Sequence, residues 1–164
     1  MQDLSKQWGD LPVLNRLNLT MKSGERLAIV GPSGSGKSTI LKLLAGLILP
    51  TGGELTLFGN KQNFLRLDQE QPADVRLVFQ NPALLGSLTV EENVGFLLKR
   101  SGRISDENIH QLVMKSLEDV GLYDVADKFP GELSGGMQKR VSFARALIND
   151  PYTEKSTMPL LLYD

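Results

Sequence analysis

The chain has 164 residues, of which 41% are hydrophobic and 23% charged, as in one ordinary folded domain. Its 18 Lys and Arg residues face 19 Asp and Glu residues, so no excess of positive charge indicates binding to nucleic acid or to an anionic membrane. It has no cysteine, which excludes disulfides and thiolate metal sites and fits a reducing cytosol. No apolar run reaches the roughly 20 residues that cross a bilayer, and the first residues lack a signal-peptide pattern, so we expect any membrane role to need a partner protein.

The first half of the chain predicts strands around one helix. The apolar run Leu27–Val30 predicts a buried strand. A glycine-rich turn follows it, and apolar residues at helical spacing predict a helix over residues 38–47. Thr51–Gly53 predicts a turn, whereas alternating polarity around Leu55 and Leu57 and the apolar run Val75–Phe79 predict strands.

The second half predicts three helices and a final strand. Thr89 and Glu92 have the spacing of a capping box, and Ser105 is the expected cap of the next helix. The apolar face predicted for that helix is Ile109, Leu112, Val113, Leu117 and Val120. The helix from Ser134 places Met137, Val141, Ala144 and Ile148 on one side and Gln138, Ser142, Arg145 and Asn149 on the other. Leu160–Tyr163 predicts the last strand, so the pattern is that of an α/β fold with a largely parallel core sheet.

Residues 31–38 have the pattern GxxxxGK[ST] between a predicted strand and a predicted helix, the context that a phosphate-binding P-loop requires. In such a loop the glycines let backbone N–H groups surround phosphate oxygens, and the helix N-terminus adds a favourable dipole. Lys37 would bridge the β- and γ-phosphates, and the Ser38 hydroxyl would ligate Mg²⁺. The alternative is a glycine-rich turn that binds nothing. The predicted nucleotide ligands are Gly31, Pro32, Ser33, Gly34, Ser35, Gly36, Lys37, Ser38 and Thr39.

A second anion-binding pattern lies at the start of the last predicted helix. Ser134, Gly135 and Gly136 leave N–H groups and a hydroxyl free to hold an anion, although an ordinary serine-capped helix would look the same. The stretch Leu133–Met137, downstream of a P-loop, resembles the LSGGQ signature of the ABC ATPase family.

Three further positions carry the same resemblance. Gln80 is similar to the glutamine of the family's Q-loop, which reaches Mg²⁺ and the attacking water; the alternative is a polar residue at the end of a strand. Asp164, after Leu160–Tyr163, resembles the magnesium-associated carboxylate of Walker B. Trp8 lies where the family's A-loop aromatic stacks on adenine; the alternative is a core or surface tryptophan. The resemblance thus implies Lys37, Gln80 and Asp164 as catalytic residues and Ser38, Gln80 and Asp164 as metal ligands.

The resemblance implies an ABC-type P-loop NTPase with a RecA-like parallel core sheet, an antiparallel β subdomain and a helical subdomain carrying the signature. We expect one partial domain: residues 1–88 as P-loop core and β subdomain, 89–148 as helical subdomain, 149–159 as an exposed loop and 160–164 as the Walker B strand. ATP and Mg²⁺ are the implied cofactors. A head-to-tail homodimer with ATP between P-loop and signature is implied, bound to a permease at the cytoplasmic face of the inner membrane.

Residues 77–98 are similar to the ATPases of the Mla and trigalactosyldiacylglycerol lipid transporters, which work with a permease and a lipid-binding MCE protein. Lipid transport is therefore expected, and ATPases of amino-acid or other solute importers remain the alternative. A soluble ABC ATPase acting on DNA or ribosomes is a weaker alternative. ABC proteins of DNA repair separate P-loop and signature by a long coiled coil, and no heptad run lies between Thr39 and Leu133. The ribosome-associated type carries two cassettes, and this chain contains only part of one. A nucleotide-binding module without turnover also remains open.

The sequence departs from the family pattern in three places. It stops at Asp164, before the family's catalytic glutamate and switch histidine, so we expect a C-terminally truncated chain that does not hydrolyse ATP by itself. Met137 replaces the glutamine of the signature. Pro151–Pro159 looks like an insertion and predicts an exposed loop.

Overall fold

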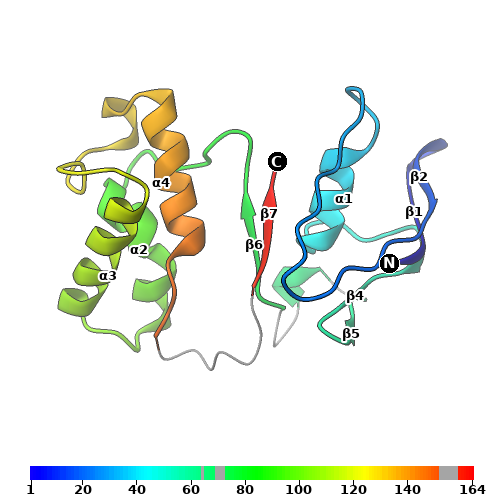
Figure 1. The fold of residues 1–164 in the computed structure, drawn as a ribbon, viewed down its shortest axis with the longest axis horizontal. Coiled ribbons are helices and arrows are strands. Elements are labelled where there is room, and N and C mark those ends of the chain that lie inside the picture. Colours follow the sequence, from blue (N-terminus) through cyan, green and yellow to red (C-terminus); the bar gives the residue numbers. More distant parts are fainter. Residues whose placement is uncertain (64, 69–72, 152–158) are drawn as a thin grey trace. The chain divides into compact units, whose positions relative to one another are not determined.

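The computed structural model describes residues 1–63, 65–68, 73–151 and 159–164 (Figure 1). The chain divides into two compact units, which are taken separately below. The described part of the first unit is residues 1–63, 65–68, 73–77, 159–162 and Asp164; that of the second is residues 78–151 and Tyr163. Most of the expected loop 151–159 lies outside the described residues. No helix among the described residues is long and apolar enough to cross a membrane.

An antiparallel hairpin forms one side of the first unit. Strands β1 (Gln2–Trp8) and β2 (Leu11–Leu17) are joined at Gly9, whose φ of 56° suits the tight turn. β3 (Gly52–Glu54) pairs with the other edge of β1, so the sheet order is β2-β1-β3. The turn predicted over Thr51–Gly53 is therefore wrong at its last two residues, because Gly52 pairs with Ser5. β4 (Thr56–Leu57) and β5 (Asn60–Lys61) form a second, short antiparallel pair.

Helix α1 and a pair of strands complete the core of this unit. α1 spans Lys37–Leu44, and its Ile40, Leu43 and Leu44 pack in one cluster with residues of β1, β2 and β6. β6 (Val75–Val78) and β7 (Leu160–Tyr163) lie side by side and run in the same direction (Figure 1). The Leu160 N–H donates to the Asp74 carbonyl at 2.9 Å. The predicted helix and both of these predicted strands are confirmed, and the fold is the expected mixture of parallel and antiparallel sheets.

The strand predicted at Leu27–Val30 is not formed: these residues are irregular, and Val30 is 88% exposed. An apolar run becomes a strand only when neighbouring strands supply hydrogen-bond partners for its backbone. Among the described residues no strand pairs with this segment. The hydrophobicity of this segment predicted a buried strand. Without a neighbouring strand in the described structure to pair with its backbone, the segment is irregular instead.

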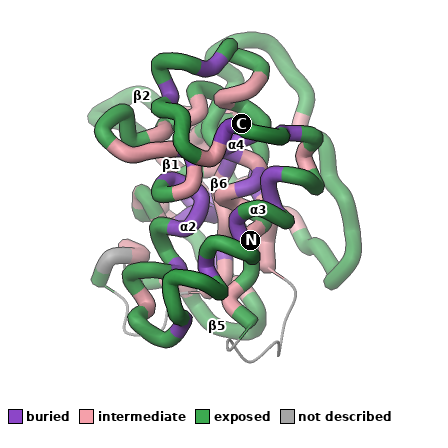
Figure 2. Tube along the Cα trace, turned by 90° about the vertical axis from the view of Figure 1, so that its left-hand side faces the viewer, coloured by how far each residue is buried: buried purple, intermediate pink, exposed green. Residues whose placement is uncertain are grey.

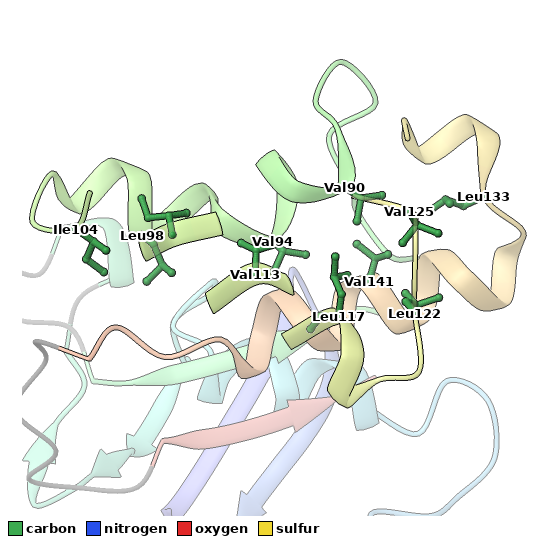
Figure 3. Close-up of a cluster of buried hydrophobic side chains, with 12 residues drawn as sticks. Val90, Val94, Leu98, Ile104, Val113, Leu117, Leu122, Val125, Leu133 and Val141 are labelled. Carbon is green, nitrogen blue, oxygen red and sulfur yellow. The ribbon is translucent and has the colours of Figure 1, made fainter. Parts of the chain in front are cut away.

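Three helices, α2 (Val90–Ser101), α3 (Asp106–Asp119) and α4 (Gly135–Leu147), build the second unit. Two short 3₁₀ turns, Arg66–Asp68 in the first unit and Pro130–Glu132 in the second, complete the described elements. Figure 3 shows the side chains on which the three helices meet, among them Val94, Leu117 and Val141. All five residues of the predicted apolar face from Ile109 to Val120 belong to this cluster or pack against it. Figure 2 shows the buried residues of the chain in purple, with such stretches on α2, α3 and α4.

The caps of these helices agree with the sequence pattern. The Thr89 hydroxyl accepts from the Glu92 N–H, and the Glu92 carboxylate accepts from the Thr89 N–H, so the capping box is present. Ser105 and Ser134 cap α3 and α4 by the same kind of bond. The polar side of α4 is not fully exposed to solvent: Ser142 is only 2% exposed, and Arg145 is half-buried.

Candidate functional site

The Lys37 ammonium lies inside the glycine-rich loop of the first unit. It donates to the carbonyl oxygens of Gly31 at 3.0 Å and Pro32 at 2.7 Å and to the Ser35 hydroxyl at 3.4 Å. Among the described residues no carboxylate forms an ion pair with Lys37. The loop therefore surrounds a positive charge that the described chain does not neutralise, an arrangement that suits a polyanionic ligand.

Two glycines of the loop have conformations that other residues adopt poorly. Gly34 has a φ of 79° and Gly36, the N-cap of α1, a φ of 90°. A Cβ atom at Gly36 would also lie 3.0 Å from the Leu14 Cδ2 atom and 3.2 Å from the Val13 carbonyl oxygen. The loop is thus packed tightly against β2, and Gly36 permits that approach.

Ser38 and Asp164 are brought together although 126 positions separate them. The Ser38 hydroxyl, on the first turn of α1, donates to the Asp164 Oδ1 atom at 2.8 Å, at the end of β7. A hydroxyl and a carboxylate are the hard oxygen ligands that Mg²⁺ prefers. These two residues therefore fit a magnesium ion beside the loop. Thr39, the next residue of α1, is half-buried.

Trp8 ends β1 and is 52% exposed, which excludes the alternative of a core tryptophan. It pairs with Leu11 in the hairpin whose second strand packs against Gly36. The hairpin that carries the indole is therefore the one that supports the glycine-rich loop. The Lys6 ammonium lies 4.4 Å from the centroid of the Trp8 ring, a contact that sequence reasoning missed.

Gln80 belongs to the second unit and is exposed in a bend just after β6. The segment after it is held by two side chains that the sequence analysis did not assign to it. Arg145 donates to the carbonyl oxygens of Pro82 at 2.9 Å and Ala83 at 2.8 Å. Asn93, 1% exposed, accepts from the Leu85 N–H and donates to the Leu85 carbonyl.

These contacts give the segment after Gln80 one defined shape. Ala83 has a φ of 47°, a left-handed conformation that a non-glycine residue adopts at some energetic cost. The Arg145 guanidinium binds its carbonyl oxygen and offsets that cost. Burial lowers the pKa of Arg145 from its ordinary value, but an arginine so shifted remains charged at neutral pH. The sequence placed Arg145 on the polar side of its helix and gave no signal of this contact, which depends on a segment more than sixty positions away.

The start of α4 presents Ser134, Gly135 and Gly136 at the surface of the second unit. The Ser134 hydroxyl accepts from the Met137 N–H at 3.3 Å. A Cβ atom at either glycine would meet no described atom within 4 Å, and both have helical backbones. Met137, in the place of the family's glutamine, packs against the helical core, and Gln138 donates to the Pro130 carbonyl. Neither the packing nor the backbone conformation of this unit requires the two glycines.

Comparisons with known proteins agree with this geometry. A family model described as ABC transporter matches residues 14–153. The chain is 44% identical to protein TRIGALACTOSYLDIACYLGLYCEROL 3, chloroplastic, from Arabidopsis thaliana, over 99% of this chain and 48% of that protein. It is 43% identical to the spermidine/putrescine import ATP-binding protein PotA of Oleidesulfovibrio alaskensis, over 93% and 40% of the two chains. It is 38% identical to the intermembrane phospholipid transport system ATP-binding protein MlaF of Haemophilus influenzae, over 92% and 58%.

Solved structures give the same picture. The dimeric structure of a bacterial ABC transporter cassette superposes with a TM-score of 0.81 at 35% identity, covering 92% of this chain and 69% of that one. A post-hydrolysis state of an ATP-binding cassette bound to ADP and Pi superposes with a TM-score of 0.79 at 35% identity, with the same coverage of both chains. The chain spans about half the length of the curated relatives that it matches, between 40% and 58% for those named above.

Proposed function

This chain belongs to the ABC transporter family, and from that membership we propose that it binds ATP and Mg²⁺ as the ATPase subunit of a transporter. The observation that carries the proposal is the loop around Lys37, whose ammonium contacts two loop carbonyls and has no carboxylate partner among the described residues. Similarity to a cassette solved with ADP and Pi supports it.

Each of the predicted site residues has a separate task in this proposal. Lys37 and the backbone N–H groups of Gly31 and residues 33–38 hold the phosphates, and the exposed indole of Trp8 stacks on adenine. Ser38 and Asp164 hold Mg²⁺, which neutralises phosphate charge when bound. For Gln80, which belongs to the second unit, the family resemblance implies the role of orienting the attacking water. Whether this chain turns ATP over or binds it without turnover is decided by phosphate release under saturating Mg²⁺ and ATP.

The test of the metal site is the substitution Asp164→Asn. It removes the negative charge that attracts Mg²⁺ but keeps an oxygen that Ser38 can bond. We expect ATP affinity measured by calorimetry without Mg²⁺ to be unchanged or higher, and the gain on adding Mg²⁺ to fall by at least about tenfold, the range for a lost bond to a charged group. Asp127→Asn, at an exposed position outside the first unit, is the control. An unchanged Mg²⁺ response in Asp164→Asn would remove Asp164 from the site.

We also propose a head-to-tail homodimer in which Ser134, Gly135 and Gly136 of one copy cover the ATP held by the other. The support is that alanine would suit a helix better than these two glycines, which neither packing nor backbone conformation requires. Close approach of a ligand explains small residues at this place. Similarity to a dimeric cassette agrees with it.

Gly135→Ala is expected to leave thermal unfolding unchanged or slightly higher, because the added methyl meets no described atom. ATP-dependent dimerisation, measured by sedimentation in the presence of Mg²⁺ and excess ATP, is expected to be lost. Gly131→Ala, an equally open position in the preceding turn, is the matched control. Full dimerisation of Gly135→Ala would contradict the proposed role of the signature.

Lipid is the substrate class we propose, with a permease and an MCE-type protein as partners at the cytoplasmic face of the inner membrane. The support is the similarity of residues 77–98 to that subgroup and the matches to the chloroplast protein and to MlaF. An importer of solutes is the second candidate, because PotA proteins match at comparable identity. Neighbouring reading frames distinguish the two: an MCE protein beside a permease supports lipid, and a soluble solute-binding protein contradicts it.

A further inference from the structure

Lys6 links strand β1 to the segment after α1 through one ammonium group. Its Nζ atom lies 4.4 Å from the centroid of the Trp8 ring and donates to the Leu49 carbonyl oxygen at 2.8 Å. A cation over an indole face is attracted by the ring's negative π surface. The ammonium is thus fixed at a defined place between the indole and the turn that follows α1.

The strand places Lys6 beside Trp8. Residues two apart on a strand point to the same face, and β1 carries Lys6 opposite Leu14 and Trp8 opposite Leu11. The register shifts between Lys6 and Gln7, so the strand is irregular where the two side chains meet. Lys6 is half-buried, whereas the Trp8 side chain is about half exposed. The ammonium therefore covers one side of a ring that otherwise reaches into solvent.

We propose that Lys6 is a positioning residue for the nucleotide base: it holds one face of the Trp8 indole so that the opposite face stacks on the purine. This inference rests on the proposed function, in which Trp8 contacts adenine. Restraining the indole before binding lowers the entropy that stacking would otherwise lose. A cation on one face also draws electron density toward itself, which makes the opposite face a better partner for an electron-rich purine.

The same geometry argues against a direct phosphate contact by Lys6. Its ammonium already bonds the Leu49 carbonyl and contacts the indole, whereas the loop around Lys37 contains a separate cation for the phosphates. Lys6 should therefore matter for ligands that carry a base and not for the phosphate chain alone.

The test compares Mg-ATP with inorganic tripolyphosphate by calorimetry for the wild type, Lys6→Met and Lys6→Arg. Lys6→Met keeps the aliphatic stem and removes the charge, and we expect it to weaken ATP binding about two- to fivefold, the range of an exposed cation–π contact. Tripolyphosphate affinity should not change, and Lys6→Arg should restore ATP affinity. Trp8 is the only tryptophan, so its fluorescence reports on this ring alone. In ligand-free Lys6→Met, acrylamide should quench that fluorescence more strongly than in the wild type, because the ammonium no longer covers one face of the indole.

A second arm repeats Lys6→Met in a Trp8→Ala background, where we expect no further loss of ATP affinity; Lys22→Met, at an exposed position, is the control for charge alone. Equal losses for ATP and tripolyphosphate, or a further loss without Trp8, would overturn the inference. So would a Trp8→Ala chain that binds ATP as tightly as the wild type, although tripolyphosphate binding would then leave the P-loop proposal intact. If the wild type binds neither ligand, the proposed function itself fails, and this inference with it.

Discussion

Replacing Lys37 with alanine is expected to weaken ATP binding by about 1.5–3 kcal/mol, or about 10- to 160-fold, the range for losing one hydrogen bond to a charged group. Lys37 supplies the ammonium enclosed by the loop carbonyls of Gly31 and Pro32, and no carboxylate among the described residues pairs with it. Without it, the backbone N–H groups and serine hydroxyls of the loop are the donors left for phosphate. Calorimetric titration with ATP and Mg²⁺ measures the change.

Lys42→Ala is the matched control, because Lys42 lies in the last turn of the same helix and is exposed. We expect that variant to bind as the wild type does. Because Lys37 also bonds its own loop, circular dichroism must show that Lys37→Ala keeps the wild-type fold. Undiminished binding in a folded Lys37→Ala protein would mean that the glycine-rich turn is not a working phosphate site.

The substitution Leu117→Ala should lower the free energy of unfolding by about 2–5 kcal/mol, the range for truncating a buried leucine. Leu117 is 1% exposed and lies among the side chains on which α2, α3 and α4 meet (Figure 3). The substitution removes apolar contacts and leaves a cavity that three helices cannot close without moving. Denaturant unfolding followed by far-ultraviolet circular dichroism, which reports mainly on the helices, measures the loss.

Met114→Ala, on the same helix, is the control for helix propensity and size. Met114 is 38% exposed, so its truncation should change the free energy of unfolding by less than about 1 kcal/mol. Equal effects of the two substitutions would show that the helical cluster does not contribute to stability as its burial implies.

The sequence by itself determined the elements that rest on local rules. Capping at Thr89, Ser105 and Ser134 depends on side chains within three residues of the helix start, and each cap is present. The apolar face of α3 follows from helical spacing alone. Gly34 and Gly36 of the glycine-rich loop have positive φ angles, a conformation that glycine adopts more readily than other residues. Residue roles in binding remain predictions, since they depend on ligands.

Only the tertiary structure decided the features that depend on partners distant in sequence. Leu27–Val30 has the composition of a strand but is irregular, because a ladder needs a neighbour. Gly52 looks like a turn residue and becomes strand through pairing with Ser5. The bond between Ser38 and Asp164 and the contact of Arg145 with Pro82 and Ala83 join residues more than sixty positions apart. Local patterns specify what a segment can form, and the free energy of long-range pairing and burial selects among those possibilities.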